Sequence, residues 1–199
     1  MTARRPPDRP TSGRQQRGDR TREQLIDETV RCIREEGFSA ASARHIIERA
    51  GVSWGVIQHH FGDRDGLLTA VIEDAVDNLV ASIEALSDPA LTTDTEGLVR
   101  ALWTALANPK AMAGLEILIA TKQLRAGLDE QHMQRLGTAL AGLIQNVDTG
   151  AEGEHAVAIG LLLWTAPVAM MIAEMFATLP VAAEEAQTAI AKLIDEHRS

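Results

Sequence analysis

Tyrosine is absent from this sequence, and aromatic residues together make up only 3% of its 199 residues. A large β-sandwich or barrel normally uses more aromatic and β-branched side chains than this. The hydrophobic fraction is 45%, which is enough for a core, and it is dominated by Ala and Leu, which favour helices. The composition therefore predicts an all-α protein.

Cysteine is equally scarce. The one cysteine, Cys32, cannot form a disulfide within the chain, so nothing indicates an oxidising compartment. It falls in the middle of a predicted helix between Val30 and Ile33, a position typical of a small buried hydrophobic residue. We interpret Cys32 in this way, with a redox sensor as the less favoured alternative.

Motifs for catalysis are also missing. The sequence has no Gly-rich phosphate loop, no nucleophile elbow and no His-Glu-x-x-His signature. The adjacent His59 and His60 diverge by about 100° on a helix, which argues against a metal pair. We therefore expect no enzyme activity, no cofactor and no metal.

Long apolar runs are limited to residues 156–173, an uncharged stretch of 18 residues. This is at the lower edge of the roughly 20 residues that span a bilayer, and Gly160, Thr165 and Pro167 interrupt it. We interpret it as a helix buried on all sides, within the protein or between subunits, with a membrane span as the alternative. The Arg- and Pro-rich N-terminus is unlike a secretory signal, so we expect a cytoplasmic protein without a membrane partner.

Charge is distributed unevenly along the chain, whose formal net charge is −9. Residues 1–64 contain 12 Arg and 9 acidic residues, whereas residues 65–199 contain 7 basic and 19 acidic residues. Affinity for nucleic acid depends on the local charge rather than on the total. The N-terminal part can therefore bind phosphate although the whole chain is acidic.

Helical periodicity and turn residues divide the chain into three parts. Residues 1–19, rich in Arg and Pro, are expected to form a disordered tail. Residues 20–65 should form a three-helix domain and residues 66–199 a larger helical domain. The first helix is expected to begin near Asp19 or Thr21. The later helical patterns cover Ser42–Gly51, Ser53–His60, Asp63–Leu86, 95–107, 110–124, 129–147, 153–178 and 181–197.

The most informative stretch runs from Arg44 to Leu68. Two short capped helices meet there at a turn in which Gly51 can supply the positive φ that the turn needs. This is the arrangement of a helix-turn-helix, whose second helix lies in the major groove of DNA. Ser53 leaves amide groups at a helix N-terminus, a natural phosphate site, and Gly55 allows the backbone to approach DNA closely.

This stretch resembles the DNA-binding domain of the TetR family of bacterial regulators. The resemblance covers about residues 20–75, and the helical remainder has the length expected for the family. It implies a ligand-responsive transcriptional regulator, with a repressor as the expected form. The matching residues are Gly37-Phe38, Ser42, Ile46, Ala50-Gly51-Val52-Ser53, Gly55, Ile57, His60-Phe61, Asp63 and Leu67-Leu68.

The resemblance also implies roles for individual residues. Contacts to phosphate would come from the starts of the second and fourth helices and would set the register on DNA. Contacts to base edges would come from the start of the third helix and would set the sequence preference. The predicted DNA-binding residues are Ser42, Arg44, Ser53, Trp54, Gly55, Val56, Gln58, His59, His60 and Arg64.

Departures from the family pattern affect this set. Gln58 stands where the family usually has Tyr, which removes an aromatic phosphate contact, although its amide can donate a hydrogen bond or reach an adenine. Arg64 replaces the usual Lys and keeps the charge. Trp54 is bulky for a base-facing position and could instead pack on the core; both interpretations stay open. An arm that enters the minor groove through Arg14, Arg17 and Arg20 is a less favoured alternative.

Operator binding by this motif requires two copies about 34–36 Å apart, so a homodimer on a palindromic operator is expected. The resemblance implies that the last two helices pair with those of a second subunit. The alternative is that some of these side chains belong to the core of one subunit. The predicted interface residues are Leu161, Leu162, Val168, Ile172, Ala186, Ile190 and Leu193.

A pocket for a small hydrophobic effector is expected among the C-terminal helices, because Met and Leu give a deformable apolar lining. The effector would favour a conformer in which the two DNA-binding heads are mis-spaced. The same residues could instead form an ordinary core. The predicted lining is Trp103, Met112, Leu115, Ile119, Gln123, Ile144, Trp164, Met171 and Met175.

Two further function classes stay open at this point. The loss of the family's Tyr at Gln58 allows a helical interaction or architectural module with weakened DNA binding. An activator that uses the same DNA-binding head is equally compatible with the sequence.

Overall fold

A computed structural model describes residues 13–86, 94–121, 130–146, 153–174 and 181–197. Every regular element in these ranges is a helix and none is a strand, which confirms the predicted all-α fold. The chain divides into two compact units, Met1–Leu67 and Leu68–Ser199. This division lies close to the boundary at residue 65 that the sequence indicates.

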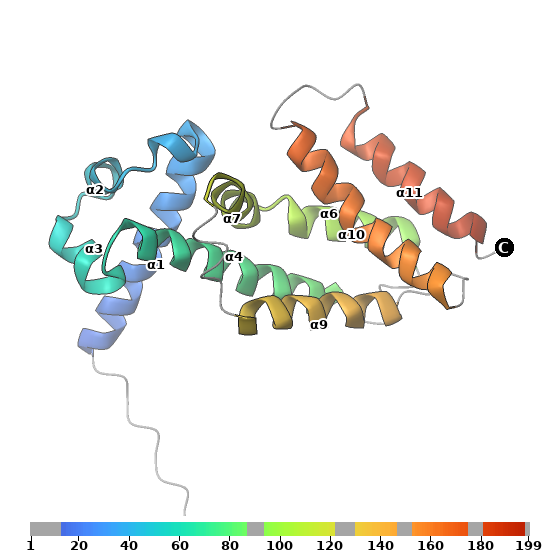
Figure 1. Ribbon diagram of the computed structural model, residues 1–199, viewed down its shortest axis with the longest axis horizontal. Coiled ribbons are helices and arrows are strands. Elements are labelled where there is room, and N and C mark those ends of the chain that lie inside the picture. Colours follow the sequence, from blue (N-terminus) through green and yellow to red (C-terminus); the bar gives the residue numbers. More distant parts are fainter. Residues whose placement is uncertain (1–12, 87–93, 122–129, 147–152, 175–180, 198–199) are drawn as a thin grey trace, which may run out of the picture. The chain divides into compact units, whose positions relative to one another are not determined.

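The first unit contains the helices α1 (Gly13–Glu36), α2 (Ala43–Ala50) and α3 (Trp54–Phe61), with a short 3₁₀ turn, η1 (Phe38–Ala40), after α1 (Figure 1). Helix α1 begins at Gly13, earlier than the expected start near Asp19 or Thr21, so residues 13–19 are helical and not part of a disordered tail. The intervening Arg and Gln side chains are good helix formers, so they can continue the helix toward the N-terminus. The predicted inward positions are all buried: Leu25, Ile26, Thr29, Val30 and Ile33.

Caps fix the ends of the short helices. The Ser42 hydroxyl accepts a hydrogen bond from the His45 amide at the start of α2. Gly51 ends α2 in the left-handed region, with φ of 65°, as the turn requires. The Asp63 carboxylate accepts a hydrogen bond of 2.8 Å from the Gly66 amide at the start of α4 (Arg64–Leu86). Both α2 and α4 therefore begin at the residues that the sequence indicates.

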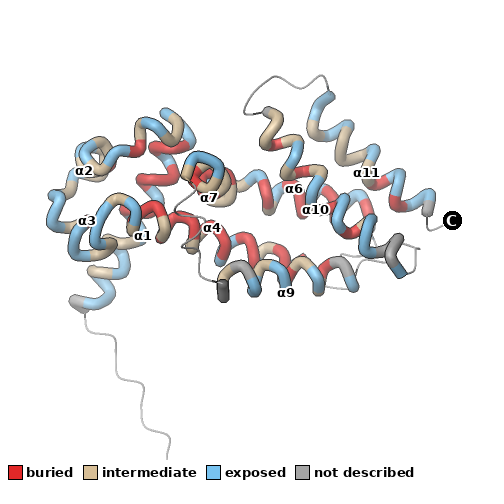
Figure 2. Tube along the Cα trace, viewed as in Figure 1, coloured by how far each residue is buried: buried red, intermediate tan, exposed pale blue. Residues whose placement is uncertain are grey.

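The second unit contains most of α4 together with α6 (Thr95–Leu106), α7 (Pro109–Ala120), α9 (Glu130–Asn146), α10 (Glu154–Glu174) and α11 (Ala183–His197). Figure 2 shows the apolar stripe of α4 as a run of buried positions. Asp94 and Asn108 cap α6 and α7 through their side chains. The buried residues of the α4 stripe are Leu67, Leu68, Val71, Ile72, Ala75, Val76, Leu79, Val80 and Ile83.

Polar contacts tie α4 to its neighbours in this unit. Lys110 on α7 forms an ion pair of 2.8 Å with Asp74. Arg135 on α9 forms one of 2.6 Å with Asp77, one turn further along α4. These two pairs hold α7 and α9 beside the apolar stripe.

Helix α10 is apolar around its circumference, but a single chain buries only one of its faces. Leu163 and Met171 are buried, whereas Val157, Leu161 and Leu162 are 54%, 51% and 60% exposed. The sequence predicts a helix that is buried on all sides, either within one chain or between subunits. The structure does not bury it on all sides within one chain. Within the described ranges, no helix combines the length and the apolarity needed to cross a bilayer.

We expect Gly114→Ala to destabilise the protein. A Cβ at Gly114 on α7 would lie 2.8 Å from the Ala75 Cβ on α4, closer than packed carbon atoms approach. Such overpacking should lower the free energy of unfolding by about 1–3 kcal/mol, measured by urea denaturation. Gly137→Ala on α9 is the matched control, because no atom lies within 4 Å of its Cβ position. Equal stability of the two variants would contradict this close packing of α7 on α4.

Candidate nucleic-acid interface

Helix α2 is held on α1 by a network of charges centred on Arg49. Its Nε donates a hydrogen bond of 2.6 Å to Glu28, and its two terminal nitrogens donate to Glu35, at 2.7 Å, and to Glu36. His45 on α2 also pairs with Glu36, at 2.8 Å. The guanidinium fork therefore joins one position of α2 to three carboxylates of α1.

The charges of this network stabilise each other in their ionised forms. Hydrogen bonds from Arg49 and then from His45 lower the pKa of the Glu36 carboxyl. The carboxylates of Glu28, Glu35 and Glu36 raise the pKa of the Arg49 guanidinium. Arg49 therefore remains a fixed positive charge between the two helices.

The sequence pattern alone does not reveal this network. One signal was present, because Glu28 falls three residues after Leu25 and four before Cys32, within the apolar stripe of α1. A carboxylate in such a stripe is almost never buried without a partner. The partner itself, Arg49, is 21 residues away in the sequence.

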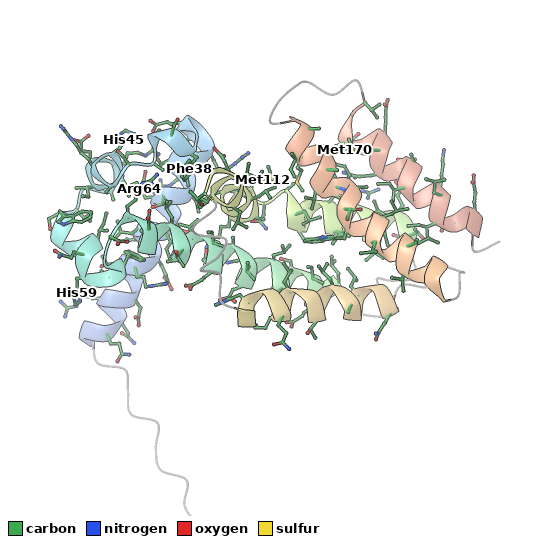
Figure 3. All side chains as sticks on the ribbon, viewed as in Figure 1. Phe38, His45, His59, Arg64, Met112 and Met170 are labelled. Atoms are coloured by element: carbon green, nitrogen blue, oxygen red, sulfur yellow. The ribbon has the colours of Figure 1, made fainter. Side chains whose placement is uncertain are left out.

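Arg64 lies at the start of α4 and is engaged within the first unit. Its Nε donates a hydrogen bond of 2.7 Å to the Ala41 carbonyl, and its guanidinium carbon lies 5.1 Å from the centre of the Phe38 ring. Figure 3 shows the Arg64 and Phe38 labels close together in this part of the chain. The side chain, which is 32% exposed, therefore stabilises the segment before α2. Only some of its N–H groups are left to donate hydrogen bonds to an external phosphate.

Helix α3 places one side chain inward and several outward. Ile57 is completely buried, whereas Trp54 is 44% exposed, and Gln58 and His59 are exposed. Figure 3 shows His59 on the outside of α3. The exposure of Trp54 favours the interpretation in which it faces outward over the one in which it packs on the core.

The N-terminus of α3 is open to an external partner. Ser53 precedes the helix but makes no side-chain cap hydrogen bond. A Cβ at Gly55 would have only the Ser53 hydroxyl within 4 Å, at 3.8 Å. The fold of the unit therefore does not itself require glycine at this position, and the missing side chain leaves room for something outside the protein.

The other predicted DNA-binding residues differ in exposure. Arg44 has a side chain that is 90% exposed and pairs with Glu48 at 2.9 Å. Ser42 is exposed and caps α2, and Val56 is half-buried. Arg17 and Arg20 are exposed on α1, while the side chain of Arg14 lies outside the described residues.

His60 faces the protein more than its neighbour does. Its ring is half-buried and lies 4.9 Å from the His59 ring and 6.1 Å from the Phe61 ring, both measured between centroids. Burial, followed by the positive charges of His59 and Arg22, lowers its pKa from the usual 6.5, and Asp19 opposes this shift. The structure therefore separates His60 from the outward-facing side chains of α3.

A partly open cavity of about 150 Å³ lies among the helices of the second unit. Of the predicted effector-binding residues, Leu115, Trp164 and Met171 line it. Trp103 and Met112 are buried elsewhere, and Ile119 is 43% exposed. Gln123, Met175 and the side chain of Ile144 lie outside the described residues. The full lining is Ile72, Ala75, Val76, Leu79, Leu106, Ala111, Gly114, Leu115, Leu118, Leu136, Trp164, Val168 and Met171.

The predicted interface residues also separate into groups. Leu162, Ile190 and Leu193 line an apolar groove between α10 and α11, and Leu161 is exposed. Val168 lines the internal cavity instead. Ile172 and Ala186 are half-buried.

Comparison with known proteins identifies the first unit. Residues 25–71 match the sequence profile of bacterial regulatory proteins of the TetR family. Over this segment the chain is similar to regulators of the TetR family. The transcriptional regulator BetI of Burkholderia thailandensis is 43% identical over 61 residues, which cover 31% of this chain and 31% of BetI. The chain thus matches about a third of the length of the curated relatives compared, which makes the DNA-binding domain the shared part.

Solved structures extend the likeness to the fold of the remainder. A protein of Mesorhizobium loti assigned to the TetR family of transcriptional regulators has a TM-score of 0.67 at 18% identity. The match covers 91% of this chain and 96% of that one. The multidrug binding protein EbrR, complexed with malachite green, has a TM-score of 0.54 at 18% identity and covers 88% and 96%. At these identities the likeness shows a common fold.

We expect His60 to make stability depend on pH near neutrality. Because its pKa is lower in the folded chain than in the unfolded one, the unfolded state binds the proton first as pH falls. The contribution of neutral His60 to the free energy of unfolding is complete well above pH 6.5. It decreases as pH falls through 6.5 toward the pKa of His60 in the folded chain. Melting temperatures between pH 8 and 5.5 should fall less steeply for His60→Gln than for the wild type.

His59→Gln is the control for this experiment. His59 is exposed, so its replacement should leave most of the pH dependence in place. If the His60 variant and the wild type had parallel profiles, His60 would not be the group responsible.

Proposed function

We propose that this protein is a ligand-responsive transcriptional repressor that binds a palindromic operator as a homodimer and is released by a small hydrophobic effector. The observation that carries the proposal is the outward surface of α3. Trp54, Gly55, Gln58 and His59 are exposed there on a helix that Ile57 anchors in the core. Within a TetR-family helix-turn-helix, this is the helix that enters the major groove.

The chemistry of α3 suits DNA. The N-terminus of the helix attracts a phosphate, because its amide groups and the helix dipole point toward the ligand. The absence of a side chain at Gly55 allows the backbone to come close to the groove wall. The Gln58 amide can form two hydrogen bonds with an adenine, which would give the protein a preference for A·T pairs at one position.

A homodimer accounts for the exposed apolar surface of α10 and α11. Leu161, Leu162 and Leu193 are each more than half exposed in a single chain. Soluble monomers rarely expose contiguous apolar patches of this kind. Pairing of these helices with their counterparts in a second subunit would bury them and place two DNA-binding heads on one operator.

The cavity of the second unit supports a small and uncharged effector. Its lining has no charged side chain, and the Trp164 indole is its one hydrogen-bonding side chain among the described residues. An apolar pocket of about this volume can hold a molecule the size of benzene. The effector would act by binding more tightly to the conformer that does not fit the operator.

Two alternatives differ from this proposal in what they predict. An interaction module with weakened DNA binding would use the same apolar surfaces but would show no steep salt dependence on DNA. An activator would bind the operator with the same head and differ only in its effect on transcription.

We expect the purified protein to bind DNA from upstream of its own gene, with affinity that falls steeply as salt increases. Gln58→Ala should weaken specific binding roughly tenfold or more, because it removes a base contact, measured by fluorescence anisotropy. Gln134→Ala, an exposed glutamine on α9, is the matched control and should bind like the wild type. Arg64→Ala is less suitable, since its loss also removes the bond to Ala41.

Two results would contradict the proposed DNA binding. If neither the upstream DNA nor any sequence selected from a random library bound with salt dependence at low salt, the head would be inactive. Binding by the Gln58 variant with unchanged affinity and sequence preference would remove α3 from base recognition at that position.

We expect benzene, used as a neutral probe, to raise the melting temperature by occupying the cavity. Leu115→Phe, which fills part of the lining, should reduce this increase. Ile119→Phe is the matched control, because Ile119 lies on the same helix but is exposed and outside the lining. An unchanged melting temperature of the wild type in saturating benzene would argue against an accessible apolar site.

A further inference from the structure

Three side chains with different metal-binding chemistry meet between α1 and α2. Cys32 and Glu36 lie one turn apart on α1, and His45 extends from α2. The Cys32 sulfur, a Glu36 carboxylate oxygen and a ring nitrogen of His45 all lie within 4.8 Å of one another. This cluster belongs to the first unit and is separate from both the outward face of α3 and the effector cavity.

The surroundings of Cys32 are not those of an ordinary core cysteine. The residue is completely buried, as the sequence predicts for a small hydrophobic side chain. Burial raises the pKa of the Cys32 thiol, as do the carboxylates of Glu36, Glu28 and Glu35, whereas Arg49 lowers it. Because Glu28 also pairs with Arg31, three carboxylates stand against two guanidinium groups. The region keeps an excess of one negative charge, which favours a cation.

We propose that Cys32, Glu36 and His45 bind a divalent cation of the Zn²⁺ type. Thiolate, imidazole and carboxylate are the three ligand types that Zn²⁺ takes in proteins, and three protein ligands with a water in the fourth position is a common arrangement. The thiolate and imidazole disfavour Mg²⁺ and Ca²⁺, which prefer oxygen ligands.

The cluster can reach metal-binding geometry by side-chain rotation. Ligands of one tetrahedral Zn²⁺ at about 2.0–2.3 Å lie roughly 3–4 Å from each other, so movements of about 1 Å are sufficient. The side chains of His45 and Glu36 are 36% and 37% exposed, which gives them freedom to move and gives the ion a route from solvent. The imidazole already presents Nε2 to the Glu36 carboxylate at 2.8 Å.

Binding exchanges existing contacts for bonds to the ion. The hydrogen bond between His45 and Glu36 is replaced by two metal bonds, while Arg49 keeps its contacts with Glu28 and Glu35. The Cys32 thiol loses its proton to solvent when the sulfur–metal bond forms. No electron is transferred, and Zn²⁺ keeps its oxidation state.

The position of the site gives it a structural consequence. Its ligands come from both α1 and α2, so the ion cross-links the two helices that the Arg49 network also joins. Metal bound only by the folded chain stabilises that chain. The first unit therefore gains a metal-dependent stabilisation that is independent of the effector cavity.

Titration of the full-length reduced protein with Co²⁺ tests the site directly, because a cobalt–thiolate bond produces a charge-transfer absorption band. We expect the band to saturate at one Co²⁺ per chain, to disappear when Zn²⁺ is added, and Zn²⁺ to raise the melting temperature. A wild-type protein without a saturable band, and whose melting temperature Zn²⁺ does not raise, would overturn the proposal.

Variants then assign the ligands. Cys32→Ser should abolish the band. Loss of a residue that only contacts a metal ligand weakens metal binding roughly 10–100-fold. His45→Gln removes a ligand itself, so it should weaken Co²⁺ binding by more than this. Glu48→Gln, which changes an exposed carboxylate elsewhere on α2, is the matched control and should keep wild-type binding. Circular dichroism establishes that each variant is folded, and Cys32→Val supplies a second thiol-free variant. An intact band in either thiol-free variant, or unchanged affinity in His45→Gln, would exclude this site.

Discussion

The contact between Arg49 and the carboxylates of α1 fixes the helix-turn-helix. Helix α2 has eight residues, too few for a stable helix on its own, and its one fully buried side chain is Ile46. The guanidinium adds charge-assisted hydrogen bonds to Glu28, Glu35 and Glu36, which set both the distance and the rotation of α2 on α1. Because α3 follows α2 after a three-residue connection, the presentation of its outward face depends on this contact.

The outward face of α3 is formed by residues that the packing of the first unit does not require. Ile57 supplies the anchor, and the turn at Gly51 supplies the change of direction. Ser53 and Gly55 have no role that the unit itself requires. In contrast, Arg64 is engaged with Ala41 and Phe38, so a residue that the family resemblance assigns to phosphate also braces the fold.

The second unit combines close packing with an apolar cavity. Gly114 brings α7 against α4, while the pairs of Asp74 with Lys110 and Asp77 with Arg135 hold two helices around the same stripe. The cavity lies beside these contacts and is lined almost entirely by aliphatic side chains. The chemistry of this lining therefore suits a small apolar molecule.

The sequence by itself determined the helical segments, the ends of α2, the start of α4 and the likeness of the helix-turn-helix to TetR-family regulators, because periodicity, Ser42, Gly51 and Asp63 act over a few residues. It also indicated which side of α4 is buried. The tertiary structure decided which distant side chains meet: Arg49 with Glu28, Arg64 with Phe38, and His45 with Cys32 and Glu36. It likewise selected Leu115, Trp164 and Met171, but not Trp103 or Met112, for the cavity. Such contacts depend on helix rotation and packing distance, and a pattern of residue types along one helix does not specify the partner across the core.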